Sequence, residues 1–128
     1  MANTTTKLGR MGELSVAIDL LKKGWNVYEP VVDDHGVDLV AEKNNTTHYV
    51  QVKSHSHSKY QQSKPSIEIR LRKPSKANIM AVPMEMHRCI CYIPIMTGQV
   101  FFSIAYREAK NKQNAHRQWY EDYLEVPE

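Results

Sequence analysis

Three polar side chains stand at fixed places in two short apolar segments of the sequence. Asp38 lies in the first segment, and Gln51 and Lys53 lie two residues apart in the second. If both segments are strands of one hairpin, they present a carboxylate, an amide and an ammonium group on one face. Carboxylate and amide oxygens are ligands for hard divalent cations, and an ammonium group binds phosphate. The spacing therefore predicts a metal and phosphate site.

The hairpin that must position this site runs from Asp33 to Ser54. Alternation predicts strands over Val37–Glu42 and His48–Ser54, joined by a turn at Asn44-Asn45. The apolar members of each strand share one face, which we expect to form the core side, and the three polar residues point the other way. The expected core positions are Val37, Leu39, Ala41, Val50 and Val52.

A helix is predicted from Arg10 to Lys23, because apolar residues recur at helical spacing and Gly24 follows as a stop. Glu13 then falls in the first turn. Its carboxylate either complements the positive end of the helix dipole or belongs to the site, and the local pattern favours the dipole. The recurring apolar residues are Leu14, Ala17, Ile18 and Leu21.

The remaining chain alternates loops with short apolar runs. The segment Ser54–Pro65 is polar and reads as a loop, Lys76–Ala81 fits either a strand or a short helix, and Ile104–Tyr123 has a polar helical pattern. This order predicts a single α/β domain over residues 1–128 around a mixed β-sheet flanked by helices, with residues 1–8 flexible and 54–66 a loop. The further predicted strands are Trp25–Tyr28, Ile67–Leu71, Arg88–Ile95 and Val100–Ser103.

Length, charge and cysteine content limit the classes of protein to which this chain can belong. The chain has 128 residues and a formal charge of +3, so it suits one domain and is compatible with a polyanionic partner. The sequence has only two cysteines, Cys89 and Cys91, so a disulfide framework is excluded. Both lie in an apolar run and are expected to pack in the core rather than bind metal. The sequence shows no signal peptide and no membrane-length apolar run, so we expect a cytoplasmic protein.

These motifs, in this order, resemble the PD-(D/E)xK nuclease superfamily with its restriction-endonuclease-like fold. The resemblance is to small stand-alone members, and archaeal Holliday-junction resolvases share the order of the signature. It covers residues 9–54 well and 88–95 loosely. The matching pieces are Gly12-Glu13 with Ala17, Asp38-Leu39-Val40, Gln51-Val52-Lys53-Ser54, Gly24 with Val27 and Pro30, and Tyr92-Ile93-Pro94.

The resemblance implies a site that uses Mg²⁺ or Mn²⁺ to hydrolyse phosphodiester bonds. Asp38, the amide oxygen of Gln51 and the backbone carbonyl of Val52 would be metal ligands. Lys53 would orient the attacking water, and Glu13 would bind the metal through water or hold a second ion. The sequence departs from the family pattern at Gln51, which stands where an acid is usual, and this lowers the negative charge of the site.

Several residues outside the hairpin site are predicted to contact DNA. For some of them a zinc site or a solvated surface is the alternative. A zinc pair at His55 and His57 is disfavoured, because no third ligand lies near. The basic residues of the strand near Arg70 fit either phosphate contacts or a solvated strand end. The predicted DNA-contacting residues are Arg10, Ser54, His55, His57, Lys59, Arg70, Arg72 and Lys73.

The sequence thus predicts a metal-dependent DNA endonuclease acting on branched, Holliday-junction-like DNA or on a specific duplex. A homodimer is expected, because one chain holds one site and two strands need two cuts. The alternative is a DNA-binding module of the same fold that is weak or inactive as an enzyme. A third interpretation is a structural subunit in which Asp38 and Lys53 form a buried ion pair.

Overall fold

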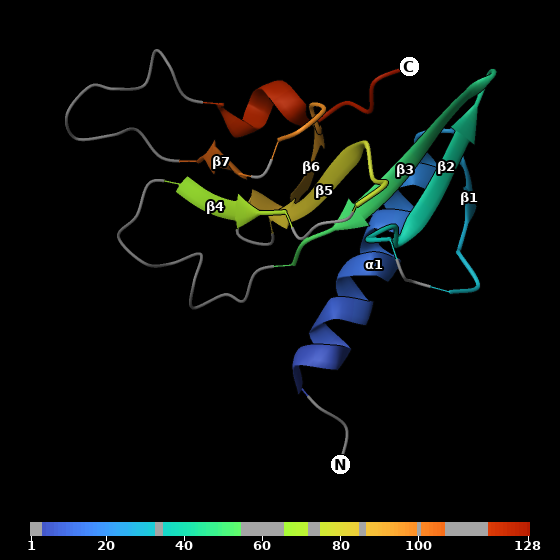
Figure 1. Cartoon of the computed structure of the whole chain (residues 1–128), viewed down its shortest axis with the longest axis horizontal. Coiled ribbons are helices and arrows are strands. Elements are labelled where there is room, and N and C mark those ends of the chain that lie inside the picture. Colours follow the sequence, from blue (N-terminus) through green and yellow to red (C-terminus); the bar gives the residue numbers. More distant parts are fainter. Residues whose placement is uncertain are drawn as a thin grey trace.

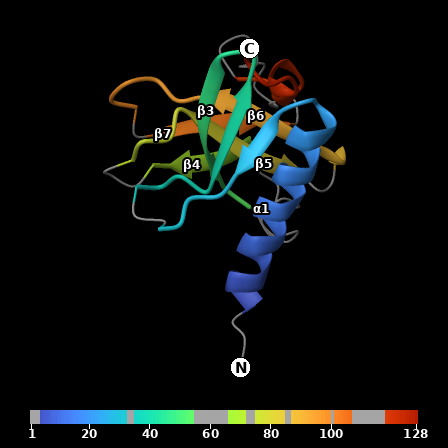
Figure 2. The ribbon, with the colours of Figure 1, turned by 90° about the vertical axis from the view of Figure 1, so that its right-hand side faces the viewer.

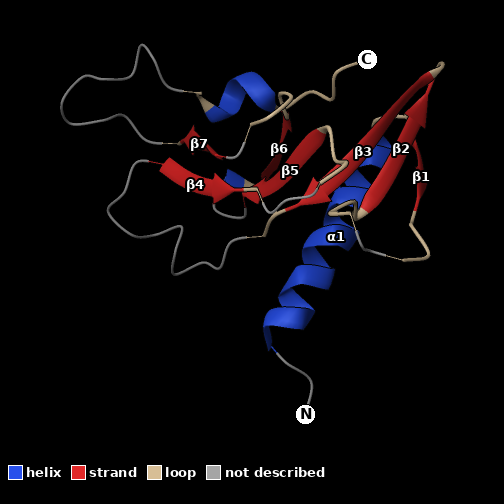
Figure 3. Cartoon of the chain, in the orientation of Figure 1, coloured by secondary structure: helices blue, strands red, loops and turns tan. Residues whose placement is uncertain are grey.

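A computed structural model shows one long helix packed on a five-stranded sheet, with a second sheet of two strands beside it (Figures 1 and 3). No helix in the described part of the chain is long and apolar enough to cross a membrane. The structure describes residues 4–32, 35–54, 66–71, 75–84, 87–99, 101–106 and 118–128.

The helix α1 (Thr4–Lys22) begins earlier than the predicted Arg10 and ends one residue before the predicted Lys23. Gly24 has a φ of 90°, which an L side chain rarely adopts, and closes the helix by two backbone hydrogen bonds. Its own amide donates to the carbonyl of Leu21, at 3.1 Å, and the amide of Trp25 donates to that of Leu20, at 3.0 Å. This pair of bonds is a Schellman motif, so Gly24 fixes the helix end and sends the chain back along the sheet.

The helix buries a different face from the one that the apolar spacing emphasised. Val16 and Leu20 are fully buried against the sheet, whereas Leu14, Ile18 and Leu21 are exposed. Both sets recur at helical spacing, so periodicity alone predicts the helix but does not select its inward side. The prediction of a helix is confirmed, but its core-facing residues are Val16 and Leu20.

Three antiparallel strands form one side of the large sheet: β1 (Asn26–Tyr28), β2 (Leu39–Lys43) and β3 (Thr46–Val52). Asn44 and Asn45 join β2 to β3, and their φ values of 49° and 69° are those of a tight hairpin turn. Leu39 pairs with Val50 in this hairpin. The register turns the predicted apolar faces toward α1, where Leu39, Ala41 and Val50 are fully buried.

The other side of the large sheet mixes the strand directions. The strand β5 (Ile79–Met84) runs parallel to β3, and β6 (Cys89–Pro94) runs antiparallel to β5. The sheet order is β1-β2-β3-β5-β6, which confirms the predicted mixed sheet. The ambiguous segment Lys76–Ala81 resolves as a strand that starts at Ile79.

The strands β4 (Ser66–Arg70) and β7 (Phe101–Ala105) pair antiparallel as a separate sheet. Their apolar side chains form a second core with those of β5 and β6, on the other side of the large sheet from α1 (Figure 2). The predicted helix from Ile104 is wrong at its start, because Ile104 and Ala105 belong to β7. Pairing with β4 holds this segment extended, although its local sequence pattern is helical.

The last residues lie close to the core between α1 and the large sheet. A short 3-10 helix, η3 (Tyr120–Tyr123), stands at the end of the predicted C-terminal helix, and Val126 packs among the residues that α1 buries. Residues 107–117 of that predicted helix lie outside the described residues. So do Asp33 and Asp34 of the first turn and residues 55–65 of the predicted loop.

Candidate active site

Asp38 lies just before β2, beside the end of β3. Its backbone amide donates to the carbonyl of Val50 at 2.8 Å, and its Oδ2 accepts a hydrogen bond from the amide of Val52, also at 2.8 Å. These contacts reach both neighbours of Gln51. The carboxylate is therefore held against the main chain at the end of β3, next to Gln51.

The amide oxygen of Gln51 is the unusual atom of the site. Gln51 Oε1 is buried and has no hydrogen-bond partner among the residues that the structure describes. It lies close to Gly36, 3.6 Å from where a Cβ on that residue would stand. Leaving a buried acceptor unsatisfied costs about 1–3 kcal/mol. A cation bound beside Asp38 would satisfy this oxygen, so the donor set fits a hard divalent metal that keeps several waters.

The carboxylates near the site are few. The described part of the chain holds no group of three or more His, Cys, Asp or Glu side chains arranged to bind a metal. A metal here would instead be held by the carboxylate of Asp38, the amide oxygen of Gln51 and the backbone carbonyl of Val52, as the resemblance implied. Such a set carries less negative charge than an acidic cluster and should bind Mg²⁺ more weakly.

Lys53 follows the last residue of β3. Its backbone amide donates to the carbonyl of Ala81 at 2.9 Å, which fixes its main chain against β5, while its side chain is exposed. Among the described residues, ion pairs join Arg10 to Glu13 and Glu29 and join Lys43 to Glu128. The exposed side chain of Lys53 does not fit the buried ion pair of the structural-subunit interpretation.

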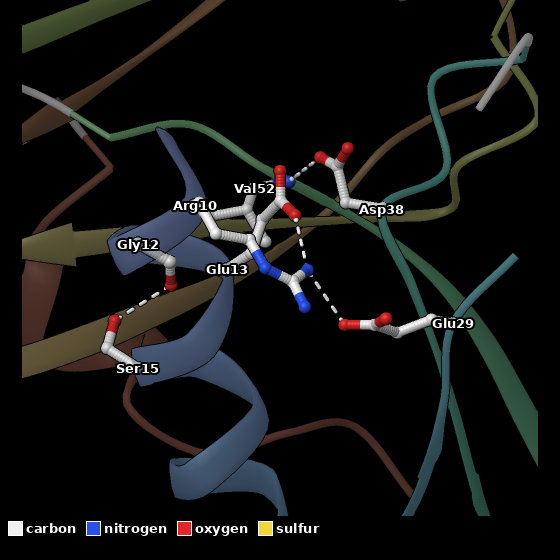
Figure 4. A network of polar contacts seen from close by, with 7 residues as sticks. All are labelled: Arg10, Gly12, Glu13, Ser15, Glu29, Asp38 and Val52. Carbon is white, nitrogen blue, oxygen red and sulfur yellow. Dashed lines mark hydrogen bonds and ion pairs between the residues drawn. The ribbon is translucent and has the colours of Figure 1, made fainter. Parts of the chain in front are cut away.

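Glu13 stands in the middle of α1, facing the site (Figure 4). Because the helix begins at Thr4, Glu13 is not in the first turn, and the dipole interpretation is wrong. Its carboxylate contacts the guanidinium of Arg10 at 3.2 Å, and the same guanidinium contacts Glu29 at 2.8 Å. The pKa of Arg10 is raised, first by the hydrogen bond to Glu29 and then by that to Glu13.

A close contact between α1 and the end of β3 was not predicted. A Cβ on Gly12 would lie 1.8 Å from Ser54 Oγ and 3.2 Å from Ser54 Cβ, so a larger residue at this position would have to displace the Ser54 side chain. Ser54 Oγ is buried without a hydrogen-bond partner in the described structure. Gly12 was already part of the matched pattern, and a glycine inside an otherwise regular helix was the available signal.

The predicted DNA-contacting residues fall into three groups. Arg10 is engaged with Glu13 and Glu29, and Ser54 turns its hydroxyl toward Gly12. Arg70 is exposed on β4, with its guanidinium 5.5 Å from the ring centre of Phe101. The residues that lie outside the described structure are His55, His57, Lys59, Arg72 and Lys73.

The two cysteines pack as expected for core residues. Cys91 is fully buried, with its Sγ 3.2 Å from Met84 Sδ, and Cys89 is partly buried at the end of the same strand. Burial raises the pKa of the Cys91 thiol to about 12, and the neighbouring Cys89 adds to this. A thiol so hard to ionise is a poor metal ligand and a poor nucleophile.

Comparisons with known proteins agree with this architecture. No curated protein matches the sequence significantly. Seven chains of solved structures match, among them the bacterial homing endonuclease I-Ssp6803I. That likeness has a TM-score of 0.65 at 18% identity, covers 86% of this chain and 80% of the other, and confirms the restriction-endonuclease-like fold. A sequence model described as PD-(D/E)XK endonuclease matches residues 3–126. Because this match spans nearly the whole chain, the protein belongs to the PD-(D/E)XK endonuclease family.

Proposed function

We propose that the protein is a metal-dependent endonuclease that hydrolyses DNA phosphodiester bonds at Asp38, Gln51 and Lys53. The observation that carries the proposal is the buried, unsatisfied oxygen of Gln51, a residue one step beyond the Leu39–Val50 pair and therefore across from Asp38. A folded chain tolerates such an atom at a cost, and a bound cation would remove that cost. Membership of an endonuclease family supports the reaction class.

Each side chain has a role that its position supports. The bound Mg²⁺ or Mn²⁺ would polarise the phosphate and lower the pKa of the attacking water. Asp38, just before β2, and Gln51 of β3 would hold it, with the carbonyl of Val52 as a further ligand. Lys53, exposed at the end of β3, would hold the water and the developing negative charge on the phosphate.

Glu13 would act from the opposite side of the site. Its carboxylate faces Asp38 and Val52 but is shared with Arg10. A carboxylate already paired with a guanidinium is a weak direct ligand, which favours contact with the metal through water. Arg10 would then be a positioning residue that holds Glu13 and Glu29 together rather than a primary contact to DNA.

The cleavage test uses labelled linear, nicked and four-way DNA with Mg²⁺ or Mn²⁺. The three substrates separate a junction-cleaving activity from cleavage of duplex DNA, and a homing endonuclease among the structural neighbours supports adding long duplexes of varied sequence. Asp38→Ala and Lys53→Ala should each lower the rate at least about a hundredfold, as expected for removing a ligand or a charge-stabilising group. Asp122→Ala, on an exposed residue of η3 away from the site, is the matched control.

Two outcomes would count against the catalytic assignment. One is no cleavage of any substrate, and the other is equal cleavage by wild type and by the Asp38 and Lys53 variants. If DNA still shifts in a gel without being cut, the protein is a DNA-binding module of the nuclease fold.

A second measurement tests the metal site without relying on activity. Gln51→Glu restores the acid that the family pattern expects, and Gln51→Leu removes the oxygen while keeping a similar size. We expect tighter Mn²⁺ binding by Gln51→Glu and weaker binding by Gln51→Leu, read by electron paramagnetic resonance of free Mn²⁺. In metal-free buffer Gln51→Glu should have a lower Tm, because two carboxylates would then repel each other, and Mn²⁺ should restore it. Equal Mn²⁺ affinity in all three proteins would contradict the assignment of Gln51 as a ligand.

A further inference from the structure

The outward side of α1 carries an apolar stripe that the fold leaves uncovered. Met11, Leu14, Ile18 and Leu21 are 63%, 45%, 54% and 58% exposed. They stand on the side of the helix opposite to Val16 and Leu20, which are fully buried. Single exposed apolar residues are ordinary on protein surfaces, but four on one side of one helix form a continuous patch.

The spacing of the stripe is that of a helix that packs against another helix. Its members follow one another at intervals of three, four and three residues. This alternation keeps apolar side chains on one seam along a helix and is the pattern of paired helices. A helix that packed only against the sheet would need only one apolar side. The second apolar side therefore indicates a second packing partner.

We infer that the stripe is the surface on which a second copy of this chain docks, α1 against α1. A helix face with this repeat is complementary to itself, since each side chain fits between those of an identical helix. A two-fold axis through such a seam gives a closed dimer in which both copies use the same residues. DNA is not the occupant, because a stripe without charge offers nothing to a phosphate backbone.

The size of the surface suits a dimer. The four side chains expose on the order of 300–400 Å² of apolar area, within the range of functional patches on single proteins. Beside the stripe lies a groove of about 270 Å³ between α1 and the start of β6, lined in part by Ile18, Met84 and Ile90. A specific interface should bury at least about 1,000 Å², so the groove and the polar flanks of both helices have to contribute beside the two stripes.

The position of α1 links this interface to the candidate site. The same helix presents Glu13 to the site from one side and the stripe to solvent from another, and its N-terminal half projects beyond the strands (Figures 1 and 2). The reason for pairing rests on the proposed function, since two sites are needed to cut two strands. The surface itself is deduced from the helix alone and stands without that function.

The test is sedimentation velocity of the whole chain over a wide range of protein concentration, without DNA. The wild type should show a monomer–dimer equilibrium, and Ile18→Glu should weaken dimerisation at least about a hundredfold, because it places a charge in the seam. Met96→Glu is the matched control: Met96 is 68% exposed and lies outside the stripe, so this variant should dimerise like the wild type. Ile18→Ser repeats the test with a neutral side chain, and thermal unfolding of each variant checks that it is folded.

A wild type that stays monomeric at every concentration would overturn the inference, as would dimerisation that both folded Ile18 variants leave unchanged. Because no DNA is present, failure here is separate from failure of the proposed nuclease. A dimer that does not cut DNA would support the interface and contradict the nuclease activity. A monomer that cuts DNA would support the activity and contradict the interface.

Discussion

The helix α1 has two apolar sides, one buried against the sheet and one exposed. The inward side brings Gly12, Val16 and Leu20 onto the sheet and joins the core to the end of β3. The outward side carries the stripe of Met11, Leu14, Ile18 and Leu21, which the described part of this chain does not cover. The comparison teaches that apolar residues at helical spacing predict a helix, whereas the packing of the sheet decides which side of the helix is buried.

The largest difference between the two sides should appear in the neighbouring pair Leu20 and Leu21. Leu20→Ala empties a fully buried position and should lower the free energy of unfolding by about 2–5 kcal/mol. Leu21→Ala changes a residue that is 58% exposed and should alter it by less than about 0.5 kcal/mol in the monomer. Urea unfolding at low protein concentration measures both. Equal effects would remove the distinction between the sides.

The two glycines of α1 offer a second matched pair. Gly12→Ala should cost about 1–2 kcal/mol of stability, because its Cβ would displace the side chain of Ser54. Gly9→Ala meets nothing within 4 Å and should instead stabilise the helix by about 0.5–1 kcal/mol. Thermal unfolding compares them. Ser54→Ala added to Gly12→Ala should recover part of the loss, and no recovery would mean that the contact at Ser54 is not the cause.

An effect of similar size should come from the hydrogen bond that joins the flank of α1 to β6. Tyr92 donates its hydroxyl to Asp19 Oδ2 at 2.6 Å, and Tyr92→Phe should cost about 1–2 kcal/mol. Burial, and then the bond to Asp19, raises the pKa of Tyr92. The folded phenol therefore stays protonated above about pH 10, where the unfolded one ionises, so this contribution is complete below pH 10 and declines above it. Unfolding measured from neutral pH to about pH 11 should show a steeper loss in wild type than in Tyr92→Phe.

Much of the hairpin around the candidate site followed from the sequence because it depends on local pairing. Alternation predicted the two strands, and the Asn44-Asn45 turn fixed the register that sets Asp38, just before β2, across from Gln51 of β3. The dipole alternative for Glu13 was wrong, because α1 starts at Thr4, in a polar segment with no apolar period that could mark the start. The predicted helix at Ile104 was wrong because only the packing of β4 against β7 shows that this segment is extended.

By itself the sequence determined the order of elements, the hairpin and the residues that face one another across it, because strand periodicity and turn chemistry are local properties. The tertiary structure decided which side of α1 is buried, how closely Gly12 approaches Ser54, and that the amide oxygen of Gln51 is left without a partner. These features depend on distances between segments far apart in the chain, and burial and steric fit select among alternatives that local periodicity leaves equal.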